Sequence, residues 1–161
     1  MKEKNQTQCG NMVGMAIAYK DAAVLLRVAD QFTTQLARSP GVKNPQGISL
    51  EFHRVIFSQI LLYSLNIEIL LKSIILADED KKARGHKWTE LFNKLSTERQ
   101  TTIIEQMPEQ FKGDFPKLLA SNEDTFVKWR YSYEKQELKC DFSFVENLSN
   151  VLTAIAMKMV N

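Results

Sequence analysis

Glycine, proline and cysteine are scarce in this 161-residue sequence, which holds six, four and two of them. Because glycine and proline interrupt helices and here stand outside the long apolar-periodic stretches, their scarcity predicts a mostly helical protein. The two cysteines, Cys9 and Cys140, belong to no CxxC pair. They exclude a disulfide framework and indicate reduced thiols in a cytoplasm. The sequence also has no large excess of either charge, because 21 basic and 19 acidic residues leave a net charge of +2. This balance does not indicate a strongly basic nucleic-acid binder.

The motifs of several enzyme classes are also absent. The sequence has no glycine-rich phosphate loop, no GxSxG elbow and no HExxH helix. Its histidines and cysteines are scattered at positions 9, 53, 86 and 140, which argues against a zinc site, and no Glu-x-x-His pair is present for a di-metal carboxylate bundle. We therefore expect neither a metal nor another cofactor.

A membrane span is not expected either. The most apolar window, residues 60–77, contains Glu68 and Lys72, and each central charge costs roughly 2.5–3.5 kcal/mol on insertion. This window is predicted to be a buried helix. Residues 1–10 are polar and lack the apolar core of a signal peptide, so we expect a flexible leader there and a single domain over residues 11–161.

Four substantial helices with short helices between them are predicted from periodicity, caps and breakers. The first has apolar or small residues at Met12, Met15, Tyr19, Ala22, Leu26, Ala29, Thr33 and Leu36, and a loop over 39–47 with two prolines ends it. The other helices are expected at 49–77 with Ser49 as N-cap, 87–95, 97–107, 126–134 after a Ser121 cap, and 143–159; residues 111–119 are expected to be irregular. Capping boxes are predicted at Thr97–Gln100 and Ser143–Glu146. The fold class is an all-α, up-and-down helical bundle.

Ser64, Glu68 and Lys72 form an i, i+4 row on the otherwise apolar second helix. Glu68 and Lys72 are expected to form an ion pair. A pair at the rim of the bundle, with the Lys72 stem along apolar surface, is the simpler interpretation, although a charge pair on a central helix usually has a third partner.

His86 follows Gly85 at the start of an amphipathic turn that buries Trp88. It is predicted to cap that turn, with a bond to a neighbouring carboxylate and an acid–base role as the alternatives.

Arg130 and Glu134 stand at the edge of a later helix whose face with Trp129 and Tyr133 should enter the core. Arginine before glutamate is the weaker orientation for a helical pair, so Arg130 is expected to reach another element, either Glu68 or a phosphate.

Three motifs in this order resemble bacterial HEPN-domain proteins: Glu68-x-x-Leu-Lys72, Gly85-His86, and Phe126-x-x-Trp-Arg-Tyr131-x-Tyr-Glu134. The resemblance covers most of the chain from the first helix onward. It implies a homodimer of small helical bundles, found in toxin–antitoxin, abortive-infection and CRISPR-associated systems. In many members it implies a metal-independent endoribonuclease with an R-x4–6-H motif, in which the arginine stabilises phosphate charge and the histidine is the acid or base.

Arg130 matches the arginine of that motif, but no histidine follows it. We therefore expect a dimeric, non-catalytic HEPN-like module for RNA or protein interaction in phage defence or a toxin–antitoxin system, with an antitoxin or nucleotidyltransferase-like partner. One alternative is a divergent ribonuclease that uses Arg130 with Glu134 or His86. Another is a structural adaptor in which Arg130 is a core ion-pair residue. The polar cluster at issue contains Glu68, Lys72, Arg130, Tyr131 and Tyr133.

Overall fold

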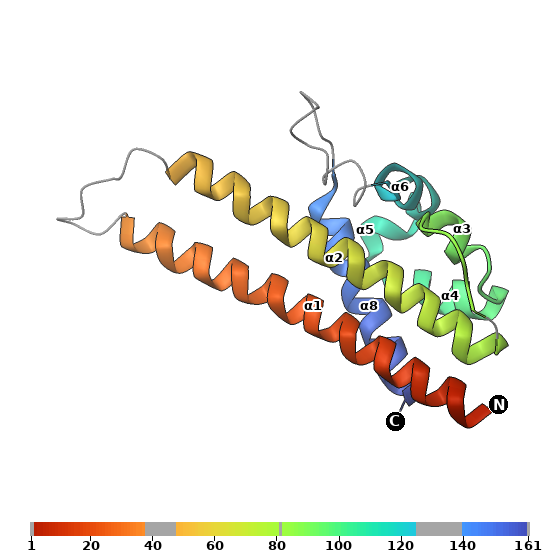
Figure 1. The fold of residues 1–161 in the computed structure, drawn as a ribbon. Helices are drawn as coiled ribbons and strands as arrows, with labels where there is room; N and C mark the ends of the chain where they lie inside the picture. The colour runs from red at the N-terminus through yellow and green to blue at the C-terminus, as the bar shows by residue number, and fades with distance from the viewer. Residues whose placement is uncertain (1, 38–47, 81, 125–139, 161) are drawn as a thin grey trace.

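The computed structural model describes residues 2–37, 48–80, 82–124 and 140–160, with side chains at 5–31, 58–80, 82–124 and 140–160. This part of the chain contains seven α-helices and no β-strand, so the all-α prediction is confirmed. The helices are α1 (Lys2–Ala37), α2 (Ile48–Glu79), α3 (Trp88–Phe92), α4 (Thr97–Gln106), α5 (Glu109–Lys112), α6 (Phe115–Asn122) and α8 (Phe142–Val160). Figure 1 shows α1 and α2 as a long antiparallel pair, with α8 and the short helices packed at one end of it.

Helix α1 begins at Lys2, so residues 2–10 are helical and the expected flexible leader is wrong over this range. Cys9 is buried on the same face as Val13 and Ala16, which explains why the helix continues toward the N-terminus. The buried row also differs from the predicted one, because Met15 is 46% exposed while Ala16 and Ala23 are fully buried. Both rows have helical spacing, and the row with the smaller side chains allows α2 to pack closely.

Helix α2 is the core helix of the bundle, and its observed bounds lie within two residues of the predicted ones. The segment Ser58–Glu79 is long and apolar enough to cross a membrane, but 67% of its apolar stretch is buried inside the protein. The prediction of a buried helix is therefore confirmed. Its fully buried Asn66 donates to the Ala16 carbonyl at 2.8 Å and accepts from the Ser149 hydroxyl at 2.7 Å. This polar network joins α1, α2 and α8.

Four predicted N-caps differ from the structure. Ser49 lies inside α2, which begins at Ile48. Ser96, not Thr97, caps α4, because its hydroxyl accepts from the Arg99 amide at 3.2 Å. The side chain of Asp141 accepts from the Phe144 amide at 2.9 Å at the start of α8, in place of the predicted Ser143 cap. Ser121 lies in the last turn of α6 and donates to the Leu118 carbonyl. At α4 and α8 a neighbouring polar residue, Ser96 or Asp141, takes the capping role.

The short helices α3 to α6 enclose an aromatic cluster beside α8. Neighbouring rings in this cluster have centroids 5.2–5.8 Å apart, and the rings are those of Phe92, Phe111, Phe115 and Phe144. The expectation that residues 111–119 are irregular is wrong, because they contain the end of α5 and the start of α6. Gly113 joins the two helices, and Pro116 occupies the first turn of α6.

Candidate functional site

The carboxylate of Glu68 is the centre of a polar cluster at the edge of α2. Its Oε1 atom lies 2.7 Å from Lys72 Nζ and 2.8 Å from His86 Nδ1. The Glu68 side chain is 12% exposed and the Lys72 side chain 19% exposed. The predicted rim pair therefore forms, and His86 is a further partner of the carboxylate. Ser64 does not join them, because it is buried and donates to the Ile60 carbonyl at 2.7 Å.

His86 binds a carboxylate and does not cap the following helix. Helix α3 starts after Lys87 and has no side-chain cap, so the capping prediction is wrong. Since an ionised carboxylate only accepts hydrogen bonds, the Nδ1 atom of His86 carries the proton that faces Glu68. The His86 side chain is 76% exposed, which leaves the other ring nitrogen on the solvent side.

Gly85 determines how His86 returns to α2. Its φ angle is +101°, a left-handed conformation that residues with a Cβ rarely adopt. A Cβ at this position would make only an ordinary contact with Glu90 Oε2, at 3.4 Å, so the backbone angle is what favours glycine. The glycine therefore fixes the turn that brings the imidazole to Glu68.

Arg130, Tyr131, Tyr133 and Glu134 lie outside the described residues. The structure thus brings together Glu68, Lys72 and His86 from the candidate residues, and the predicted contact between Arg130 and Glu68 stays a prediction.

Another polar cluster joins three helices through Glu146 on α8. Its Oε1 atom lies 2.5 Å from an Arg27 guanidinium nitrogen on α1 and accepts from the Tyr63 hydroxyl on α2 at 3.4 Å. Burial, together with the negative charge of Glu146, raises the pKa of Tyr63 to about 12. Sequence reasoning assigned Glu146 to a capping box and did not connect it with Arg27 or Tyr63, which lie far from it along the chain.

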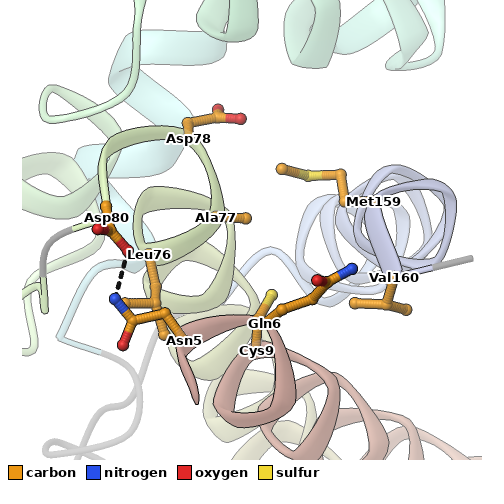
Figure 2. Close-up of a pocket in the computed structure, with 9 residues that line it drawn as sticks. All are labelled: Asn5, Gln6, Cys9, Leu76, Ala77, Asp78, Asp80, Met159 and Val160. Atoms are coloured by element: carbon orange, nitrogen blue, oxygen red, sulfur yellow. Dashed lines mark hydrogen bonds between the residues drawn. The ribbon is translucent and has the colours of Figure 1, made fainter. Parts of the chain in front are cut away.

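A cavity of about 390 Å³ lies where the start of α1 meets the ends of α2 and α8 (Figure 2). Its lining residues are Asn5, Gln6, Cys9, Leu76, Ala77, Asp78, Asp80, Met159 and Val160. Asp78 is engaged by Arg99, at 2.9 and 3.0 Å, and Asp80 accepts from Asn5. Burial, reinforced by the charge of Asp78, raises the pKa of the Cys9 thiol. The thiol is therefore protonated at neutral pH and is not an activated nucleophile.

Metal binding has no support in the described part of the chain, where no group of three His, Cys, Asp or Glu side chains is placed to hold an ion. The polar groups that the structure brings together are ion pairs and hydrogen bonds between helices. Among the described residues the geometry defines an all-α helical bundle with a carboxylate–imidazole pair, Glu68 and His86, whose imidazole is open to solvent.

Comparison with protein-family models, with curated protein sequences and with solved structures gives no match to this chain. The HEPN resemblance accordingly rests on the residues quoted for it.

Proposed function

We propose that this chain is a HEPN-like helical module that works as a homodimer and has no catalytic activity of its own. The observation that carries the proposal is an exposed apolar row on α1, which we call the outer row and define as Gly14, Ala18, Leu25 and Val28. Leu25 is 68% exposed and Val28 is 55% exposed. A contiguous row of exposed apolar residues marks an interaction site, whereas single exposed apolar residues are normal on a protein surface.

The outer row lies on the face of α1 turned away from α2. Steps of four, seven and three residues keep its members on one side of a helix with 3.6 residues per turn. The buried row, with Val13, Ala16 and Ala23, lies on the opposite side. Figure 1 shows α1 along the outer edge of the molecule, where a second helix has access to it. A second long helix is therefore the occupant that fits this surface.

A second copy of the same helix suits the row because a two-fold axis makes the same surface serve both partners. An exposed charged residue, Asp21, lies on the same face between Ala18 and Leu25. An antiparallel pairing centred between Leu25 and Val28 places leucine against valine. It also separates Asp21 from its symmetry mate by about 16 Å along the helix, given a rise of 1.5 Å per residue. Like charges are thus kept apart while Leu25 and Val28 are covered.

The proposal is tested by sedimentation equilibrium of the full chain. The wild type is expected at about 37 kDa, twice the chain mass of 18.5 kDa. The double variant Leu25→Glu/Val28→Glu is expected to sediment as a monomer that keeps its helical circular dichroism spectrum, because both side chains are exposed within one chain. Its urea midpoint should be independent of protein concentration, whereas that of the dimeric wild type should rise with concentration. Met157→Glu, at the exposed Met157 on α8, is the matched control and should stay dimeric. A monomeric wild type, or a dimer that survives the double substitution, overturns the proposal.

We propose the cellular role that the HEPN resemblance implies, in phage defence or in a toxin–antitoxin system of the cytoplasm. In that setting the dimer presents its surface to an antitoxin or nucleotidyltransferase-like partner.

A divergent metal-independent ribonuclease is the second candidate function. The Glu68–His86 pair favours it, because a carboxylate that fixes an exposed imidazole is an arrangement used in general acid–base catalysis. Cleavage of a structured RNA pool in EDTA is the test, with His86→Ala, Arg130→Ala and Glu134→Ala variants shown to be folded by circular dichroism. Cleavage that is lost in a folded variant identifies a ribonuclease. No cleavage, together with unfolding of Arg130→Ala, favours the adaptor in which Arg130 is a core residue.

A further inference from the structure

We propose that the cavity where α1 meets the ends of α2 and α8 binds a small primary alkylammonium ion, with its ammonium group at Asp80 and its alkyl chain against α8. The cavity holds about 390 Å³, which equals the liquid volume of about thirteen water molecules and lies near the lower end of the range for ligand pockets. A ligand with a short carbon chain therefore fits it. The inference does not depend on the dimer or on the HEPN resemblance.

The lining of this cavity has a polar side and an apolar side. Figure 2 shows Asn5 and Asp80 joined by a hydrogen bond on one side, and Met159 on α8 across from them. The Cys9 thiol is protonated at neutral pH, so it adds no charge to the apolar side. A ligand with a charged head and an apolar body matches this division. The apolar lining residues are Cys9, Leu76, Ala77, Met159 and Val160.

The polar side of the cavity favours a positive charge. Three consecutive acidic residues, Asp78, Glu79 and Asp80, stand at the C-terminal end of α2, where the helix dipole is negative and anions are unfavourable. Arg99 balances Asp78, whose carboxylate it holds at 2.9 and 3.0 Å. Asp80 accepts from the uncharged Asn5 amide and forms no ion pair within the described residues. None of the described residues that line the cavity is basic, so a cation must come from the ligand.

The backbone of Asp80 supports a role for its charge. Its φ angle is +57°, in the left-handed region in which glycine or asparagine commonly follows a helix. Its amide donates to the Leu76 carbonyl at 3.1 Å and thereby closes the last turn of α2. Asparagine would suit this conformation equally well and would avoid a negative charge at the negative end of the helix. A bound cation therefore explains the aspartate better than helix stability does.

A primary ammonium group fits better than a quaternary ammonium group or a metal ion. An ionised carboxylate has about four acceptor sites, so the bond from Asn5 leaves room at Asp80 for the N–H donors of an ammonium group. Quaternary ammonium ions are recognised by aromatic faces, and none of the described lining residues is aromatic. The described part of the chain also has no group of three His, Cys, Asp or Glu side chains placed to hold a metal.

The test is a titration of the ¹⁵N-labelled full chain with n-pentylammonium chloride, followed by the NMR shifts of the backbone amides. The salt concentration is kept near about 20 mM, where exposed charges are weakly screened. The shifts should centre on the residues that line the cavity. Affinity should rise up to about fourfold from n-butylammonium to n-pentylammonium, because one more methylene is buried. The controls n-pentanol and pentyltrimethylammonium, which lack the charge or the N–H donors, should bind at least about tenfold more weakly.

The variant Asp80→Asn tests the carboxylate. It should bind n-pentylammonium at least about tenfold more weakly, while its urea midpoint without ligand stays equal to that of the wild type or rises. A merely structural role of Asp80 would lower the midpoint instead. Glu79→Gln removes the same charge from the adjacent residue, which does not line the cavity, and should bind within about twofold of wild type. Equal losses in the two variants, or equal binding of n-pentanol and n-pentylammonium, overturn the inference.

The variant Ala77→Leu tests the cavity while leaving Asp80 in place. Ala77 lines the cavity from an exposed position on α2, and leucine is a good helix former, so the protein should stay folded. The larger side chain fills the space for the alkyl chain and should abolish binding. Unchanged binding in this variant, at an unchanged urea midpoint, contradicts the proposed position of the ligand. An absence of shifts in the wild type at about 50 mM ligand, well above a millimolar Kd, overturns the inference as well.

Discussion

Replacing Asn66 by alanine is expected to destabilise the protein strongly. Asn66 lies at the contact of three helices, where it donates to the Ala16 carbonyl on α1 and accepts from the Ser149 hydroxyl on α8. Both Asn66 and Ser149 are fully buried. Alanine removes both hydrogen bonds. The buried Ser149 hydroxyl then loses its acceptor, and a small cavity remains where the Asn66 amide was.

The magnitude follows from those terms. Each lost hydrogen bond is worth about 1 kcal/mol, and a buried polar group left without its partner adds about 1–3 kcal/mol. The free energy of unfolding should therefore fall by about 3 kcal/mol, a large part of the roughly 5–15 kcal/mol typical of a domain. With a urea dependence of about 2 kcal/mol per molar, the unfolding midpoint should move down by about 1.5 M.

Urea unfolding followed by circular dichroism measures this change, and Ser149→Ala supplies the comparison. The serine variant removes one bond and should cost about 1–2 kcal/mol. In the double variant the Asn66–Ser149 bond is counted once, so its cost should be less than the sum of the single costs by about 1 kcal/mol. A loss below about 1 kcal/mol in Asn66→Ala, or strictly additive costs, would refute the reasoning that this network joins the helices.

Two further predictions concern the turn at Gly85 and the tyrosine at the three-helix contact. Gly85→Ala places a Cβ at a φ of +101° and should cost about 1–3 kcal/mol in urea unfolding, whereas Gly113→Ala, at a helical φ of −63°, should be neutral or stabilising by up to about 1 kcal/mol. Equal effects would show that the strain argument fails. The variant Tyr63→Phe tests stability at alkaline pH. The pKa of Tyr63 is raised to about 12 in the folded state, so the unfolded chain loses this proton at a lower pH than the folded protein does. The free energy of unfolding therefore falls as the pH rises from about 10 to 12. At pH 11 the wild type should lose about 1 kcal/mol more than Tyr63→Phe, relative to pH 8. Parallel pH profiles for the two proteins would contradict this assignment.

Local chemistry explains which expectations agree with the structure. The ends of α2 and α4 were predicted within about two residues, because breakers and polar caps act over one helical turn. The Glu68–Lys72 pair was predicted for the same reason, since residues four apart meet on any helix. The expected leader failed because a polar sequence can continue a helix when one face, here at Cys9, finds a covering partner.

The sequence by itself determined the helices α2, α4 and α8 and predicted that α2 is buried, because the spacing of apolar residues and the position of glycine and proline act within a few residues. Only the tertiary structure decided which row of α1 faces the core. Two rows have helical spacing, and the close fit of small side chains against α2 selects one and leaves Leu25 exposed. The same holds for the contacts of His86 with Glu68 and of Glu146 with Arg27. These pairs are 18 and 119 residues apart along the chain, and they meet only because the packed helices place them side by side.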